Sequence, residues 1–330
     1  MVYAFASRRK WMMGVLAGLV LIGNSAAQSS DWPSKPIKVI VPWPPGGPTD
    51  VATRIITQRL AERLKQPFVI ENRAGAAGTI GTQQAARSAP DGYTFTMMAT
   101  PTLLATYLYK SKPVDVTKDL APVAAAYDLP IVLVVNPQAL PGVKTLPDLV
   151  AKIKASKDDF IYTTSSPGSI AHVSMSDWAD QADLRMQHIA YKGGPAAMTD
   201  LLGGQVPVMF SDLVVALPHI QSGKLIALAI GSPRRIEQLP QVKTFAEQGF
   251  KDFSAVALGG LLAPLGTPQH IVDRVSGEMK SILDEPEVRQ RLIQAGTQPA
   301  YKNSMEMTQF LRGYADKWGS VIQRKKISAD

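Results

Sequence analysis

The sequence predicts a mixed α/β fold built as two domains. Short apolar runs typical of buried strands, such as Ile37–Val41 and Ile131–Val135, alternate along the chain with segments whose apolar residues recur at helical spacing. The chain has 330 residues, 45% of them hydrophobic, which is enough for two cores. It contains no cysteine, so the fold depends on those cores and not on disulfide bonds.

The expected strands share a β-branched or aromatic composition and are bounded by turn residues. They are Ile37–Val41, Phe68–Glu71, Thr94–Met98, Ile131–Val135, Phe160–Thr164, Met186–Ala190, Val206–Phe210 and Leu225–Ile230. The first expected helix follows Ile37–Val41, and either Thr49 or Asp50 is well placed as its N-cap. After Thr267-Pro268 the chain is expected to be helical to about Lys325.

The N-terminal residues resemble a secretory signal peptide. A basic cluster at 8–10 precedes an apolar run, Trp11–Ile22, and small residues follow at 24–27. The run is shorter than the roughly 20 residues that a membrane span needs. We therefore expect cleavage after Ala27 and a periplasmic mature protein that is soluble. An uncleaved N-terminal anchor is the alternative.

The charge pattern argues against nucleic acid as a partner. The formal net charge is +8, and removing the three basic residues of the leader leaves +5. The remaining Lys and Arg residues are scattered and form no basic stripe interleaved with aromatic residues. A mild positive field would still help to gather anionic ligands. The short cluster Arg324–Lys326 is expected to be a solvated helix end.

Two strand-to-helix connections share one design. The segments from Val41 to Thr49 and from Thr164 to Ser169 both contain Pro and Gly, and each leads from a strand into a helix. Such a loop directs backbone N–H groups and the positive end of a helix toward one point, so it can bind an anion without a charged side chain. Two such loops facing each other across a cleft would hold both ends of a dicarboxylate.

Compact catalytic motifs are missing. The four histidines are not at metal-ligand spacing, and neither a G-x-S-x-G nor a G-x-x-x-x-G-K-[ST] motif occurs. We therefore expect a binding protein with no cofactor and no metal. A secreted hydrolase or lyase for a small organic acid stays the alternative, because catalytic groups can lie far apart in the chain. The Gly-rich segment 75–81 either docks a helix or contacts ligand, and His172 either packs or contacts ligand.

Five blocks, taken in order, resemble the Bug receptors, the TctC-like solute-binding proteins of tripartite tricarboxylate transporters. The first is PIKVIVPWPPGGPTD at 36–50, and the others are Glu71–Gly81, Ala89–Thr94, Tyr191–Gln205 and Ala263–Pro268. The resemblance covers nearly the whole mature chain. It implies a receptor that captures a small carboxylate and works with membrane transporter subunits or a sensor. We also expect the protein to be a monomer.

The resemblance also implies the type II periplasmic-binding-protein fold. In that fold two α/β domains, joined by two crossing strands, close on the ligand like a hinge. We place the crossings near Leu129–Val134 and Phe253–Leu258. Domain one is then 28–129 plus 256–330, and domain two is 130–255.

The family's ligand-binding positions transfer to the matching positions of this chain. Together with His172 they are Pro45, Gly46, Gly47, Thr49, Ala76, Ala77, Thr100, Ser165, Ser166, Gly168, Ser169, Tyr191, Gly193 and Asp212. Thr100 is expected to face the cleft. Two positions keep structural alternatives, because Tyr191 could be a wedge between helix and sheet and Asp212 could be the N-cap of the next helix.

Two departures from the family pattern bear on ligand size. Val256–Gly260 lacks the large aromatic residue that many relatives carry there, and Trp43 stands where a smaller aromatic residue is common. A pocket with hydroxyls and glycines at its ends and an apolar middle would suit a dicarboxylate, aliphatic or aromatic. A structural or adhesive protein is the third possibility, and the two-loop design argues against it.

Overall fold

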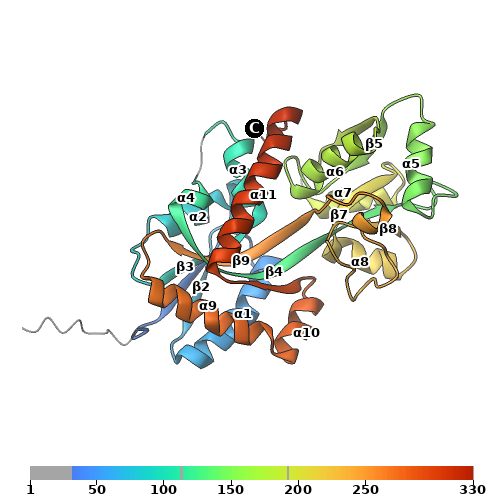
Figure 1. Ribbon diagram of the computed structural model, residues 1–330. Helices are drawn as coiled ribbons and strands as arrows, with labels where there is room; N and C mark the ends of the chain where they lie inside the picture. The colour runs from blue at the N-terminus through green and yellow to red at the C-terminus, as the bar shows by residue number, and fades with distance from the viewer. Residues whose placement is uncertain (1–31, 112–113, 192, 330) are drawn as a thin grey trace, which may run out of the picture.

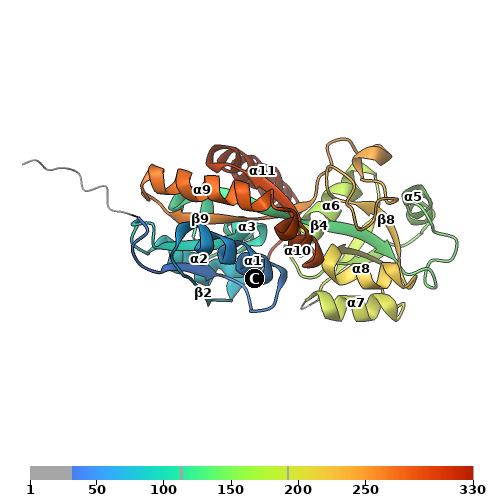
Figure 2. The same ribbon diagram turned by 90° about the horizontal axis from the view of Figure 1, so that it is seen from below.

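The computed structural model describes residues 32–111, 114–191 and 193–329. The expected signal peptide, 1–27, lies outside the described residues. The strands form two sheets that share one long strand, β4 (Leu120–Val135). Figures 1 and 2 show the elements gathered into two groups, with β4 and β9 between them. The group around the first sheet is called the first lobe, and the group around the second sheet is called the second lobe.

The first sheet has β4 at one edge of its main path, and the second sheet continues from the other half of β4. The first sheet contains β2 (Phe68–Asn72), β1 (Ile37–Val41), β3 (Thr94–Ala99), β9 (Val256–Pro264), β4 and β10 (Gln298–Lys302), and the second contains β4, β7 (Val208–Asp212), β5 (Phe160–Thr163), β6 (Met186–Ile189) and β8 (Ile226–Ile230). Residues 120–130 of β4 pair with β9, whereas Ile131–Val135 pairs with β7 and β8. One strand therefore passes from lobe to lobe.

Helices cover both faces of each sheet (Figure 1). In the first lobe α1 (Pro48–Leu64), α9 (Gln269–Leu283) and α10 (Pro286–Gln294) lie on one face, and α2 (Thr79–Ala86), α3 (Thr100–Leu108), α4 (Val116–Asp119) and α11 (Ser304–Lys325) lie on the other. In the second lobe α5 (Leu146–Lys154) and α6 (Ile170–Gln181) lie opposite α7 (Gly194–Leu202) and α8 (Leu213–Gln221). None of the helices in the described part of the chain is both long and apolar enough to cross a bilayer.

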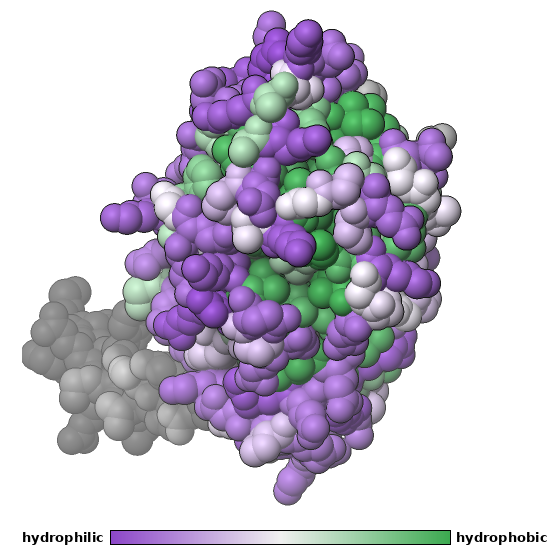
Figure 3. Space-filling view, turned by 90° about the vertical axis from the view of Figure 1, so that its right-hand side faces the viewer, coloured by the Kyte–Doolittle hydropathy of each residue, from purple (hydrophilic) through white to green (hydrophobic). Residues whose placement is uncertain are grey.

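The apolar core is continuous from lobe to lobe. One cluster of buried side chains includes Leu104 and Trp318 in the first lobe and Leu133 and Trp178 in the second. Each lobe also has its own cluster on the opposite face of its sheet. Figure 3 shows the outer end of the second lobe, where hydrophilic residues form most of the surface and apolar residues lie between them.

The chain returns beside β4 at a point where only glycine fits. The Gly231 N–H donates to the Ile131 carbonyl, and the Ala255 N–H donates to the Gly231 carbonyl, both at 2.8 Å. A Cβ on Gly231 would lie 2.6 Å from the carbonyl oxygen of Ala255. The backbones approach too closely for any side chain.

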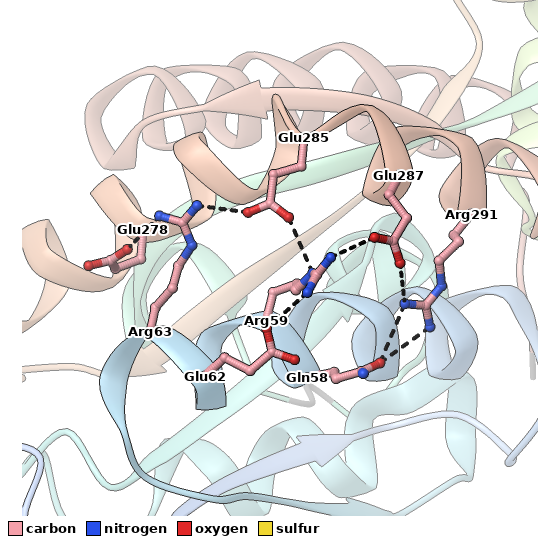
Figure 4. A network of polar contacts seen from close by, with 8 residues as sticks. All are labelled: Gln58, Arg59, Glu62, Arg63, Glu278, Glu285, Glu287 and Arg291. Atoms are coloured by element: carbon pink, nitrogen blue, oxygen red, sulfur yellow. Dashed lines mark hydrogen bonds and ion pairs between the residues drawn. The ribbon is translucent and has the colours of Figure 1, made fainter.

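The outer face of the first lobe carries a network of ion pairs between α1 and the α9–α10 region (Figure 4). Arg59 contacts Glu285 at 3.2 Å and Glu287 at 2.7 Å, and Arg63 contacts Glu278 and Glu285 at 3.2 and 2.7 Å. These charges lie near solvent, so they join helices without being desolvated.

The eight expected strands are present, with two differences. β4 begins eleven residues before the expected Ile131, because its first part is a crossing strand paired with β9. The expectation of an all-helical C-terminal region is wrong at β10, a short edge strand that contains Pro299 and pairs with β4. Its pairing depends on a distant partner and leaves no local pattern.

Candidate ligand-binding site

A cavity of about 600 Å³ lies where the first and second lobes meet. Its volume is within the usual range of small-molecule sites, about 300–1,000 Å³. Its apolar walls are Trp43, Pro48, Ala77, Ala99, Pro101, Leu108, Leu129, Pro167, Gly168, Ile170, Ala171, Val214, Val215, Ala257 and Ala329, and its polar residues are Thr49, Tyr109, Ser165, Ser166, Ser169, Tyr191 and Asp212. Polar groups therefore come from both lobes and face an apolar middle.

The first loop, 42–47, connects β1 to α1 and is held by a carboxylate. Gly46 has φ +81° and donates its N–H to Asp50 at 2.9 Å, and Arg54 also donates to Asp50 at 3.0 Å. Burial alone would raise the pKa of Asp50, but the hydrogen bonds from Arg54, Gly46 and Asn72 lower it. Asp50 thus fixes the loop and is not a ligand group.

The N-cap of α1 is not Thr49 or Asp50, as the sequence suggested. The helix begins at Pro48, and Gly47 occupies the N-cap position without a side-chain hydrogen bond. Thr49 and Asp50 therefore lie within the first turn. The Gly47 N–H donates to no described residue.

The second loop, 164–169, connects β5 to α6. Ser169 caps α6 by accepting from the His172 N–H at 3.2 Å, and its hydroxyl donates to the Ser166 carbonyl at 2.8 Å. Gly168 has φ +70°, and a Cβ there would lie 2.7 Å from the side chain of Leu108 in the first lobe. The backbone N–H groups of Ser165 and Ser166 donate to no described residue.

A pair of histidines supports this loop from behind. The Gly168 N–H donates to Nδ1 of His172 at 3.1 Å, and the His172 ring stacks on His188 with centroids 3.8 Å apart. Nε2 of His188 lies 2.9 Å from the Thr164 hydroxyl. Burial, and the neighbouring His188, lower the pKa of His172 to about 3, and burial lowers that of His188 to about 4. His172 is therefore neutral, accepts from the loop and does not line the cavity.

Tyr191 lines the cavity at the side of the second loop. Its hydroxyl donates to Asp200 on α7 at 2.5 Å, and this hydrogen bond, with burial, raises the pKa of Tyr191 to about 12. The Gly193 N–H donates to the Ser165 carbonyl at 2.8 Å. Gly193 thus supports the second loop, while the ring of Tyr191 forms the wall.

The structure brings about half of the expected site residues onto the cavity surface. They are Thr49, Ala77, Ser165, Ser166, Gly168, Ser169, Tyr191 and Asp212. The others lie behind it or beside it: Pro45, Gly46, Gly47, Ala76, Thr100, His172 and Gly193. The expectation that Thr100 faces the cleft is wrong. Its side chain is fully buried, and its hydroxyl accepts a hydrogen bond from the Leu258 N–H at 3.1 Å.

Several cavity residues carried no signal in the sequence. Leu108 and Tyr109 end α3, and Ala329 lies next to them because its N–H donates to the Leu108 carbonyl at 3.2 Å. Val214 and Val215 come from the first turn of α8. Ala257, within the segment that lacks an aromatic residue, gives the small apolar wall that the sequence predicts.

The basic cluster at the end of α11 is exposed, as expected, and two of its members also form ion pairs. Arg324 contacts Asp177 at 3.0 Å and Asp180 at 3.9 Å, and Lys325 also contacts Asp180. Both acidic residues are on α6, so these ion pairs join the first lobe to the second. No group of three His, Asp or Glu side chains in the described ranges could hold a metal ion.

A family model described as "Tripartite tricarboxylate transporter family receptor" matches residues 52–327. The chain belongs to this family. Protein BugT of Bordetella pertussis is 35% identical over 304 residues, which cover 91% of this chain and 93% of that protein. Proteins of this family are periplasmic solute-binding receptors and not enzymes, so the alternative of a hydrolase or lyase is set aside.

Solved structures show the same fold. A periplasmic transporter is 34% identical with a TM-score of 0.76, covering 91% of this chain and 100% of that one. MatC of Rhodopseudomonas palustris with bound malate is 30% identical, with a TM-score of 0.71 and coverage of 88% and 99%. Another R. palustris protein, solved with adipate, is 26% identical, with a TM-score of 0.75 and coverage of 90% and 99%. The α/β fold of this chain is that of the periplasmic binding proteins.

Proposed function

We propose that this chain is a periplasmic receptor that captures a small carboxylate, with a dicarboxylate, aliphatic or aromatic, as the favoured class. It closes two domains on the ligand and delivers it to a membrane transporter or a sensor. The relatives solved with malate and with adipate both hold dicarboxylates, which supports this class. We expect the receptor to be monomeric.

The observation that carries the proposal is the pairing of two loops across one cavity. The first loop contributes Thr49 and the start of α1, and the second contributes Ser165, Ser166 and Ser169 at the start of α6. A carboxylate loses hydration on entering, and charge-assisted hydrogen bonds from amides and hydroxyls offset that cost. Two such groups at opposite ends suit two carboxylates.

Domain closure is supported by the sheet and by contacts between the lobes. β4 changes partners between Pro130 and Ile131, which agrees with domains at 28–129 plus 256–330 and at 130–255. On one side of the molecule Arg324 contacts Asp177, and on another the Gln298 amide donates to Gln238 at 2.8 Å. A ligand that touches both lobes stabilises the closed state by its differential affinity for that state.

A thermal-shift screen of the purified protein tests the proposal. The panel contains monocarboxylates, aliphatic diacids and triacids of increasing length, aromatic acids and amino acids. A ligand at 100 times its Kd adds about 2.7 kcal/mol of stability, which raises Tm by several degrees. A shift confined to carboxylates, largest for diacids, is expected. No shift with any carboxylate, or equal shifts with monoacids and diacids, would contradict it.

A further inference from the structure

One carboxylate in the cavity has no positively charged partner among the described lining residues. Of the described residues that line the cavity, Asp212 alone has a charged side chain, and none is basic. If ionised, this carboxylate would place a negative charge in the same space as the anionic ligand of the proposed function, on which this inference rests. Like charges repel strongly when little water lies between them.

The surroundings of Asp212 explain why it stays without a partner. It ends β7 opposite Ile131, at the point where β4 enters the second lobe, and it occupies the N-cap position of α8. Its side chain makes no cap hydrogen bond, and no described residue donates to its carboxylate. Burial also raises the pKa of the Asp212 carboxyl. Asp212 therefore occupies the N-cap position that the sequence suggested as its alternative role, but its side chain does not cap the helix.

Two other aspartates, Asp50 and Asp200, are placed differently. Asp50 accepts from Gly46, Arg54 and Asn72, and Asp200 accepts from Tyr191. An aspartate that lacks such donors and faces a cavity is satisfied when a bound molecule supplies them. The side chains of Val214 and Val215 beside it are apolar, so neither of them can pair with its carboxylate.

We propose that Asp212 binds an ammonium group of the ligand and makes the receptor selective for amino-substituted carboxylates over the corresponding plain diacids. An ammonium brings a compact positive charge and three donors, so it favours the ionised form of Asp212 and supplies the hydrogen bonds that this carboxylate lacks. The ligand's carboxylate groups are held by the two loops, and its amino group faces β7. A hydroxyl at the same position donates one hydrogen bond without charge and ranks between the two.

Three acids that differ only at one carbon substituent test this inference. Succinate, malate and aspartate carry hydrogen, hydroxyl and ammonium, and glutarate, 2-hydroxyglutarate and glutamate repeat the series one carbon longer. Titration calorimetry with the full chain is expected to show the amino acid binding about tenfold or more tighter than its parent diacid in at least one series, with the hydroxy acid between them. Parent diacids that bind as tightly as the amino acids would overturn the inference.

Asp212→Asn removes the charge and keeps the shape. It is expected to weaken binding of the amino acid by about tenfold and to leave the parent diacid equal or tighter, so that selectivity is lost. Asp183→Asn, a matched loss of one exposed charge on the same lobe, is expected to change neither Kd. Without ligand, Asp212→Asn should melt no lower than the wild type, because the carboxyl that it replaces accepts no hydrogen bond from the described residues. A clear drop in Tm with unchanged selectivity would show a structural role and overturn the inference.

The outcome separates this inference from the proposed function. If diacids bind and the amino group brings no advantage, the carboxylate receptor stands and the role of Asp212 fails. If no member of either series binds and no acid of the wider panel raises Tm, both the proposed function and the role of Asp212 fail.

Discussion

The outer face of α1 and the ligand cavity differ in how charge is arranged. On the outer face each carboxylate of Figure 4 lies within ion-pair distance of at least one arginine. In the cavity the polar surface is built of hydroxyls and backbone amides, and its described lining has one carboxylate, Asp212, without a donor. The same helix takes part in both regions, since α1 starts at the cavity and ends within the network.

The comparison sets a region where opposite charges are paired against one where, as we propose, a single carboxylate serves recognition. An exposed ion pair contributes about 0–1 kcal/mol, because water already solvates both groups. Amides fixed by a loop are different, because they are oriented before the ligand arrives and need no ordering when it binds. Changes in the cavity should therefore alter affinity strongly, and changes in the network should alter it little.

The largest expected effect concerns the neutral histidine pair behind the second loop. Folded pKa values of about 3 for His172 and about 4 for His188, against 6.5 for a free histidine, mean that the unfolded chain binds more protons between those limits. Stability is then complete above about pH 6.5 and falls as the pH drops through this window. We expect Tm to be several degrees lower at pH 5 than at pH 7.

Replacing both histidines isolates this effect from that of other groups. The double variant His172→Gln, His188→Gln should show a much smaller difference in Tm between pH 5 and pH 7. His219→Gln, at a histidine outside the pair and outside the cavity lining, should keep the wild-type difference. A double variant as sensitive to pH as the wild type would disprove the assignment.

Next in size is the loss of one amide from the first loop. Gly47 has φ −73° and ψ 166°, which proline adopts without strain, and its N–H donates to no described residue. Gly47 does not line the cavity itself but directly precedes Pro48 and Thr49, which do, so we expect its N–H to meet a carboxylate bound there. Gly47→Pro should then weaken carboxylate binding at least tenfold, about 1.4 kcal/mol, with little change in Tm without ligand. Gly47→Ala keeps the N–H and is the matched control. Equal affinities of the two variants, measured by calorimetry, would show that this amide does not contact the ligand.

A smaller effect is expected from the ion pairs between α11 and α6. Arg324→Gln removes the contacts with Asp177 and Asp180 that join the lobes. Because Arg324 is half exposed, we expect a two- to fivefold loss of affinity, about 0.5–1 kcal/mol, as the closed state loses support. High salt should have the same effect on the wild type and little effect on the variant. If neither Arg324→Gln nor high salt changes the affinity, these ion pairs do not favour the closed state.

The smallest effect is expected in the outer network. Glu287→Gln breaks the contact with Arg59 at 2.7 Å, but Arg59 keeps Glu62 and Glu285 as partners. Tm should change by no more than about 2 °C, and Kd should not change. A change in Kd as large as that of Gly47→Pro would remove the distinction between the two regions.

Local sequence determined much of the fold and about half of the cavity. Each strand-to-helix loop was predictable, because Pro and Gly exclude regular structure and the apolar runs beside them fix the strands. β10 was missed because it forms only by pairing with β4. Leu108 and Ala329 were missed because they are 221 residues apart and meet only through the packing of α11 on α3. The prediction that Thr100 faces the cleft was wrong, because its hydroxyl is buried and accepts a hydrogen bond from the Leu258 N–H.

The position of Ala329 has a practical consequence. This residue lines the cavity, and the sequence contains no cysteine. A cysteine introduced at 329 would be the only thiol in the protein, so one environment-sensitive dye could be attached beside the cavity without further engineering. Its emission would change when a ligand displaces water beside it, and the receptor would become an optical sensor for its own substrate.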